Sequence, residues 1–163
     1  MIVRYCSKEW LEECARLYST TDTLENALKK ITTKLYFRIT AEPTWGIEKD
    51  ILFGAELKEG KLLDLGYFSE ADAKKEADFI LSTSPPIWKG LLRRDNKFIT
   101  EFVMGKIILE QGSKVELLKI TPYANYMVDV MTQVEIQYQD EMTSEEVEDF
   151  RADLAQFREE TGV

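Results

Sequence analysis

Three observations predict an α+β fold for this chain of 163 residues. Apolar residues recur with helical spacing between residues 8 and 31, with a spacing of two between residues 33 and 68, and with helical spacing again after residue 84. Spacings of three and four indicate amphipathic helices, and a spacing of two indicates half-buried strands. The length suggests one domain with an appendage, and such a chain can bury a core without disulfides or metal.

Two helices are predicted before the first strand. Ser7 is the expected N-cap of a helix over residues 8–18. Asp22 followed by Glu25 is a capping-box variant that opens a second helix, which extends to residue 31. The apolar faces consist of Trp10, Leu11, Cys14, Leu17 and Tyr18 in the first helix and of Leu24, Ala27, Leu28 and Ile31 in the second.

The next segments predict three strands. In residues 33–40, every second residue from Leu35 to Ile39 is apolar and faces inward. Residues 41–49 contain a proline and a glycine and are expected to form a loop. Strands over residues 51–57 and 61–68 flank the turn signal Glu59-Gly60, so they are expected to form a hairpin.

Shorter elements follow. A loop or a short helical turn is expected over residues 69–76, and a fourth strand over residues 77–83. Helices are expected over residues 85–93 and 97–104, and a fifth strand over residues 106–110. Pro122 is expected to start a new helix that extends to residue 134, separate from a helix over residues 114–120, because proline favours the first turn of a helix.

The net charge of −9 lies mostly at the C-terminal end. Residues 140–163 hold nine acidic residues and two arginines, so this segment carries −7. An acidic protein is a poor candidate for binding nucleic acid, which requires a basic surface. The chain has no histidine, which excludes His-activated nucleophiles and His-containing zinc sites. We therefore expect neither a bound metal nor a cofactor.

The apolar segments are short. None approaches 18 consecutive apolar residues, so no transmembrane helix is expected. Six charged residues interrupt residues 1–17, which argues against the apolar run of a signal peptide. These features predict a cytoplasmic protein. Cys6 and Cys14 have neither a CxxC spacing nor a disulfide framework, and Cys14 is expected to act as a small buried hydrophobe.

The C-terminal segment differs in character from the rest, so we divide the chain into a body, residues 1–139, and an acidic amphipathic helix, residues 140–163. Thr143 and Glu146 form a capping box. A narrow apolar stripe follows, which is expected to dock on the body because short isolated helices are marginally stable. A lid over a ligand cavity and the seam of a homodimer are the alternatives. The stripe consists of Val147, Phe150, Leu154 and Phe157.

Short motifs occur in a characteristic order. A strand, ADFILS at residues 77–82, precedes Ile87-Trp88-Lys89 on a helix and then FVMGKIILEQG at residues 102–112. Near the start, residues 5–10 are YCSKEW. Together these segments resemble the sterol carrier protein (nonspecific lipid-transfer) family, including the opening of its stand-alone prokaryotic members, over about residues 5–135. The chain departs from the family pattern at Ser113-Lys114, where many members have aspartate, in the charged linker 95–101, and in the acidic tail.

The resemblance implies a five-stranded, mainly antiparallel sheet covered on one face by helices, with a hydrophobic tunnel between them for fatty acyl chains, sterols or other apolar lipids. It implies no catalytic residues. Helical and strand spacing alone favours a filled core for the same apolar residues, so core and tunnel lining both remain open. The lipid-binding candidates are Phe37, Phe53, Ile80, Trp88, Leu91, Phe98, Phe102, Met104, Ile107, Leu109, Tyr126, Met127 and Met131.

Basic residues offer two further candidates. Arg38 lies on the strand face opposite Phe37, where it either holds a lipid carboxylate or phosphate or forms an ordinary ion pair. A second basic set lies beside apolar helix residues, where it either contacts an anionic membrane surface transiently or forms a solvated helix end. This set consists of Lys89, Arg93, Arg94 and Lys97.

The sequence therefore favours noncovalent binding of an apolar lipid (fatty acyl, sterol-like or isoprenoid), with transfer between membranes or presentation to an enzyme as its use. The alternative is an accessory domain with a filled core that pairs with a lipid-metabolism enzyme or with itself. A lipid-modifying enzyme that uses Glu56, Asp64 or Asp78 is disfavoured, because no paired-acid motif, phosphate-binding loop or nucleophile accompanies them. We therefore expect no enzymatic activity.

Overall fold

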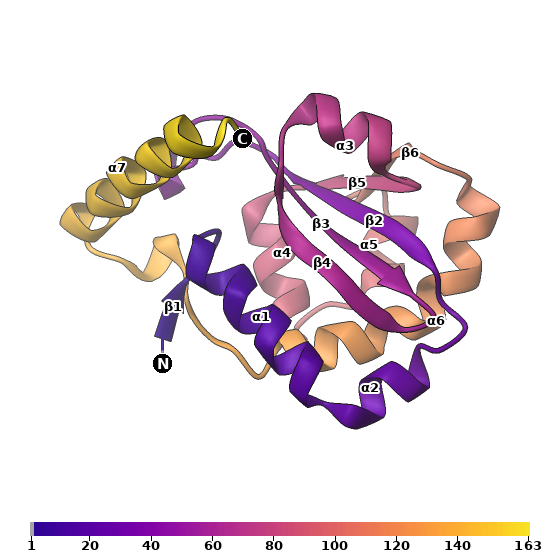
Figure 1. The fold of residues 1–163 in the computed structure, drawn as a ribbon. Helices are drawn as coiled ribbons and strands as arrows, with labels where there is room; N and C mark the ends of the chain where they lie inside the picture. Colours follow the sequence, from indigo (N-terminus) through magenta and orange to yellow (C-terminus); the bar gives the residue numbers. More distant parts are fainter. Residues whose placement is uncertain (1) are drawn as a thin grey trace.

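The structure, a computed structural model, describes residues 2–163 and is built around a five-stranded sheet (Figure 1). The strand order is β4-β3-β2-β5-β6. The central pair β2·β5 is parallel, and the other three neighbouring pairs are antiparallel, which confirms the predicted α+β class and the mainly antiparallel sheet. The strands are β2 (Thr33–Ile39), β3 (Ile51–Lys58), β4 (Lys61–Phe68), β5 (Phe79–Thr83) and β6 (Ile108–Gln111).

The hairpin β3–β4 forms where the turn signal predicted it. Glu59 and Gly60 both have positive φ, 50° and 80°, and Lys58 pairs with Lys61 across the turn. Phe37 of β2 lies opposite Phe53 of β3, and their rings stack with centroids 5.1 Å apart. Since both residues belong to the predicted inward sets, the register of this part of the sheet follows from the two-residue period.

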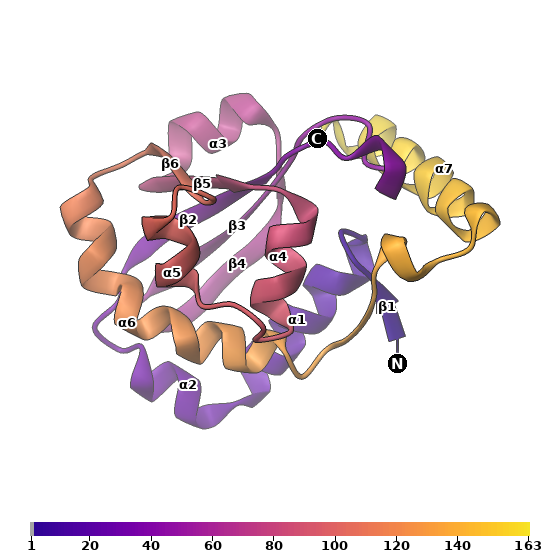
Figure 2. The same ribbon diagram turned by 180° about the vertical axis from the view of Figure 1, so that it is seen from behind.

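Most helices pack on one face of the sheet, the face seen in front in Figure 2. Helix α1 lies along β4 on this side, and its Trp10 reaches the ring of Phe53, 5.3 Å between centroids. The opposite face carries α3 (Glu70–Glu76), whose Ala73 is buried against Tyr36 and Ile80. In residues 2–163 no helix is both long and apolar enough to cross a membrane. The helices of the first face are α1 (Lys8–Thr20), α2 (Asp22–Ala27), α4 (Pro85–Leu92), α5 (Phe98–Val103) and α6 (Lys114–Met131).

Helix α1 begins as its sequence predicts. The hydroxyl of Ser7 accepts a hydrogen bond from the backbone N–H of Trp10 at 3.2 Å, which satisfies one free donor of the first turn. Trp10 is fully buried and also contacts Tyr5, with ring centroids 5.1 Å apart. Burial raises the pKa of the Cys14 thiol to about 12, so this side chain stays protonated and packs as a small apolar group.

Both ends of helix α2 differ from the prediction. Helix α2 has Thr21 rather than Asp22 as its N-cap, and it ends at Ala27 rather than residue 31. Residues 28–31 instead form a turn, in which the carbonyl of Ile31 accepts a hydrogen bond from the N–H of Gly60 at 3.0 Å. The β3–β4 hairpin therefore ends the helix through a tertiary contact that helical spacing does not reveal.

Helix α6 runs through Pro122 as a single element, so the prediction of two separate helices was wrong. Proline removes one hydrogen-bond donor and favours a bend rather than a break when neighbouring residues pack well. The helix is visibly bent in Figure 2. The hydroxyl of Thr121, next to the proline, donates to the carbonyl of Leu117 at 2.9 Å.

Several short elements have no clear sequence signal. Strands β1 (Ile2–Arg4) and β7 (Glu135–Gln137) pair in parallel, although more than 130 residues separate them. Two three-residue 3₁₀ helices, η1 (Pro43–Trp45) and η2 (Gln139–Glu141), lie in segments without regular periodicity. These elements connect the sheet to the C-terminal helix.

The acidic helix α7 (Ser144–Thr161) docks on the body beside η1. Its capping box is present as predicted: the N–H of Glu146 donates to the Thr143 hydroxyl at 3.2 Å, and the N–H of Thr143 donates to the Glu146 carboxylate at 3.0 Å. Phe150 is buried, and the ring of Phe157 lies 5.5 Å from that of Tyr67. Since the same chain covers the apolar stripe, the stripe is not available as a homodimer seam.

Candidate functional site

A cavity of about 420 Å³ lies between the sheet, the turn after α2, and the helices α4, α5 and α6. Its floor is made by β2, β3 and β5. The side chains of β2 that reach it are two residues apart along the strand, as expected for one face of a pleated strand. The floor residues are Thr33, Leu35, Phe37, Leu57 and Leu81.

The walls are apolar side chains from helices. Leu28 and Ile31 come from the turn after α2, Trp88 and Leu91 from α4, and Phe98 from the start of α5. Helix α6 forms one complete wall of the cavity, through residues at helical spacing both before and after Pro122. The α6 residues that carry this wall are Leu117, Ile120, Met127, Val128 and Met131.

Polar residues gather at the solvent-exposed end, where the α4–α5 connection meets α6. Arg94, Asn96 and Lys97 come from the connection, and Asn125 and Asp129 from α6. Arg94 forms an ion pair with Asp129 across this end. The lining of the cavity is therefore mainly apolar, with its charged and amide side chains at the mouth, an arrangement that suits an amphiphile with one polar group.

This architecture matches solved structures. A conserved hypothetical protein of Thermus thermophilus, whose description suggests a sterol carrier protein, aligns over 80% of this chain and 90% of its own, with a TM-score of 0.71 and 19% identity. A crystal structure of sterol carrier protein 2 aligns over 78% of this chain and 97% of its own, with a TM-score of 0.70 and 19% identity. The chain has the sterol carrier protein 2 fold.

The apo form of sterol carrier protein 2 from Yarrowia lipolytica shares this fold at lower similarity, with a TM-score of 0.53, 16% identity, and coverage of 73% of this chain and 89% of its own. No protein-family model matches the sequence, and no curated protein matches it significantly. The sterol-carrier fold expected from the short motifs is thus confirmed in three dimensions. The departures noted at residues 95–101 include Asn96 and Lys97, which contribute to the mouth of the cavity.

The structure divides the thirteen lipid-binding candidates. Six line the cavity: Phe37, Trp88, Leu91, Phe98, Met127 and Met131. Phe53 and Ile107 are buried in the core beside it, and Phe102 and Leu109 are partly buried against that core. Met104 and Tyr126 are instead 62% and 47% exposed, because Met104 follows the end of α5 and Tyr126 lies on the outer side of α6.

Ile80 requires a correction, because it faces away from the cavity. In β5 the side chains of Phe79 and Leu81 point inward, and Ile80 packs with Tyr36 and Ala73 under α3. All five residues of β5 are buried, since helices cover both of its faces. A strand buried on both sides shows no alternation of polar and apolar residues, so its inward set cannot be recognised from the pattern.

Several lining residues were not among the candidates. Leu28, Ile31 and Leu57 were recognised as inward apolar positions, but nothing in their spacing distinguishes a cavity wall from a core. Leu117 and Ile120 lie before Pro122, in a segment predicted as a separate helix. Their helical register with Met127 would have identified them, had α6 been treated as continuous.

The basic set on and after α4 is mostly paired with carboxylates. The ammonium of Lys89 lies 2.9 Å from the Asp140 carboxylate and 3.1 Å from that of Glu141, and Arg93 also pairs with Glu141. Lys89 and Arg93 both lie over the ring of Tyr138, within 5.2 Å of its centroid. These cations therefore hold the segment before α7 on α4. Of this set, Lys97 remains at the cavity mouth together with the paired Arg94.

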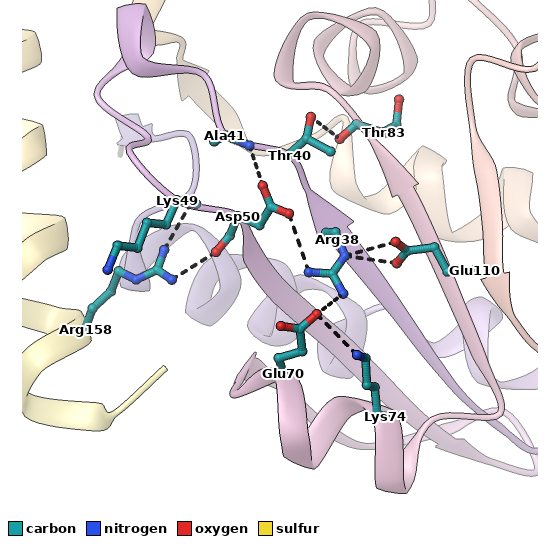
Figure 3. A network of polar contacts seen from close by, with 10 residues as sticks. All are labelled: Arg38, Thr40, Ala41, Lys49, Asp50, Glu70, Lys74, Thr83, Glu110 and Arg158. Atoms are coloured by element: carbon teal, nitrogen blue, oxygen red, sulfur yellow. Dashed lines mark hydrogen bonds and ion pairs between the residues drawn. The ribbon is translucent and has the colours of Figure 1, made fainter.

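Arg38 lies on the sheet face away from the cavity, at the centre of an ion-pair network (Figure 3). Its guanidinium donates to Glu110 at 2.9 Å and to Glu70 at 2.5 Å, and it lies 3.5 Å from Asp50. Its side chain is only 11% exposed. The geometry fits the ion-pair interpretation of Arg38, since the network joins α3, β6 and the start of β3.

The substitution Arg38→Met tests this network through its pH dependence. Hydrogen bonding and the charge of Arg38 hold the pKa of the Glu70 carboxyl below its usual range. A carboxyl with a lowered folded-state pKa stabilises the fold at neutral pH, and this contribution disappears as the pH falls through its titration. We expect Arg38→Met to lower the free energy of unfolding at pH 7, because it removes the cation that pairs with the Glu70 carboxylate. The difference from wild type should shrink towards pH 3, as measured by urea unfolding at each pH. A pH-independent difference would contradict this.

Proposed function

We propose that the protein binds a single apolar lipid noncovalently in the cavity between the sheet and α4, α5 and α6. The observation that carries this proposal is the mainly apolar cavity of about 420 Å³ with its charged and amide side chains at one end. Its volume lies within the range of roughly 300–1,000 Å³ that is typical of ligand sites. A filled core, which the accessory-domain alternative requires, would leave no such space.

The chemistry of the cavity favours a long-chain amphiphile, with a fatty acyl chain as the first choice. Each methylene transferred from water into the apolar part contributes about 0.8 kcal/mol. At the mouth, Lys97, Asn96 and Asn125 offer hydrogen-bond donors to a carboxylate or hydroxyl group. Sterol-like and isoprenoid lipids share the apolar requirement, and a competition experiment separates the classes.

The lining also suits exchange of the ligand. A bilayer offers an acyl chain the same hydrophobic gain as the cavity, so a carrier must bind its ligand about as well as the membrane does. Met127 and Met131 are flexible and polarisable, and such side chains adapt to different chains rather than fitting one precisely. We infer from this a carrier that transfers or presents lipids and has no catalytic step.

Native mass spectrometry of protein purified without detergent tests the proposal, followed by organic extraction of any bound molecule. We expect excess mass that extracts as lipid. After delipidation, the protein should take up palmitic acid in preference to cholesterol or a short-chain quinone. A mass equal to the bare chain, with no uptake of any of the three, would overturn lipid binding and favour an accessory role.

A further inference from the structure

Helix α6 is apolar on two opposite sides. The side that faces the cavity carries Leu117, Ile120 and Met127. The outer side carries a second set at spacings of three, four and four, which places them in one line along the helix. A helix that is apolar all round is normally buried, yet this outer line is exposed. It consists of Val115, Leu118, Pro122 and Tyr126, of which Val115 is 64% and Leu118 41% exposed.

The end of α5 extends this surface. Val103 and Met104 are 77% and 62% exposed. They follow Phe102, whose ring lies 6.0 Å from the ammonium of Lys114, the first residue of α6. Figure 2 shows α5 beside the first half of α6. Apolar side chains that gather on one part of a protein surface mark a candidate interaction site. We call Val103, Met104, Val115 and Leu118 the end patch.

Lysines outnumber glutamates around the end patch, three to two. Lys106, Lys114 and Lys119 are all exposed beside it. In the described part of the chain, Glu101 and Glu116 pair with Lys106 and Lys119, and no carboxylate lies within ion-pairing distance of Lys114. The acidic helix α7 lies at the opposite end of the molecule in both ribbon views (Figures 1 and 2). A negatively charged surface would therefore attract the protein by the end patch and repel it at α7.

We propose that the end patch docks on an anionic lipid bilayer, with Val115 and Leu118 inserted among the headgroups and the lysines facing lipid phosphates. Apolar residues flanked by lysines on one helix are typical of interfacial binding. Two copies meeting through this patch would bring like charges together, which disfavours a homodimer there. This inference deepens the proposed function, since α6 would separate the cavity from the bilayer by a single helix.

Co-sedimentation with vesicles tests the docking surface. We expect binding to phosphatidylcholine vesicles that contain phosphatidylserine, weaker binding to phosphatidylcholine alone, and loss of binding at high salt. The double variant Val115→Ser/Leu118→Ser should weaken binding about tenfold, because it removes the inserted apolar groups. The matched control is Ile2→Ser/Leu63→Ser, which changes two equally exposed apolar residues elsewhere and should bind like wild type.

A second assay separates docking from the cavity. Uptake of a soluble fluorescent fatty acid from buffer needs the cavity but no membrane, so Val115→Ser/Leu118→Ser should retain it. Wild-type protein that takes up fatty acid but ignores anionic vesicles would overturn the docking proposal and leave the proposed function intact. Unchanged vesicle binding by Val115→Ser/Leu118→Ser would also overturn it. The docking proposal would also be overturned if sedimentation velocity showed a dimer of the wild-type protein that Val115→Ser/Leu118→Ser abolishes, because a second copy would then occupy the end patch.

Discussion

The substitution Met127→Trp should weaken fatty-acid binding by roughly fiftyfold, because the indole would occupy space that the lipid chain needs. Met127 lines the cavity from α6 and is only partly buried, so the larger ring can enter the open space instead of forcing the core apart. Excluding about three methylenes, each worth about 0.8 kcal/mol, gives an effect of this size. Displacement of a fluorescent fatty acid measures the affinity.

The adjacent Tyr126→Trp is the matched control. Tyr126 is 47% exposed on the outer side of α6 and does not line the cavity, so the same new ring should leave affinity unchanged there. Thermal unfolding of both variants checks that the fold is retained. If Met127→Trp were to bind fatty acid as tightly as wild type while remaining folded, the ligand would have to lie outside this cavity.

These neighbouring residues also show what the sequence pattern could specify. Met127 was a candidate for its flexible apolar side chain and Tyr126 for its aromatic ring, but one residue of helix turns the side chain by about 100°. Which one faces the cavity depends on the orientation of α6. That orientation depends on the helix continuing through Pro122, which its sequence predicted to be a boundary.

The alternation of apolar and polar residues was sufficient to identify the inward-facing side chains of a strand where the main core covers only one of its faces. Leu35 and Phe37 were placed inward from their spacing, and both line the cavity floor. Alternation failed in β5, where α3 buries Ile80 as completely as the cavity side buries Leu81. Whether an inward residue lines a cavity or fills a core depends on how closely opposite layers approach, and this is a property of the assembled fold.

Capping motifs are the most local signals and were accordingly reliable. Ser7 and Thr143 both accept the expected backbone hydrogen bonds. Asp22 is not the N-cap of α2, because Thr21 takes that position. The C-terminal end of α2 is set by the hairpin turn, which contacts the following residues through Gly60. The contact between this turn and α2 shapes one wall of the cavity, because Leu28 and Ile31 lie at the contact and also line the cavity.

The substitution Gly60→Ala should therefore lower the free energy of unfolding by about 3 kcal/mol. Gly60 has a φ of 80°, and a Cβ there would lie 2.7 Å from the carbonyl carbon of Leu28 and closer still to the carbonyl oxygen of Glu25. Both are backbone atoms, so the end of α2 must move. The carbonyl of Gly60 also accepts a hydrogen bond from the Tyr18 hydroxyl at 2.6 Å, which the movement would strain. Urea unfolding measures the loss.

Gly105→Ala separates the backbone cost of a positive φ from the steric cost of the added Cβ. Gly105 has a nearly equal φ of 78°, but no atom lies within 4 Å of an added Cβ, so only the backbone cost of about 1–2 kcal/mol applies. The excess loss in Gly60→Ala then reports the contact between the hairpin and α2. Because Leu28 and Ile31 line the cavity, Gly60→Ala should also weaken fatty-acid uptake, whereas Gly105→Ala should not. Equal losses of stability in the two variants would mean that the turn and α2 are not in close contact, and this wall of the cavity would then need another support.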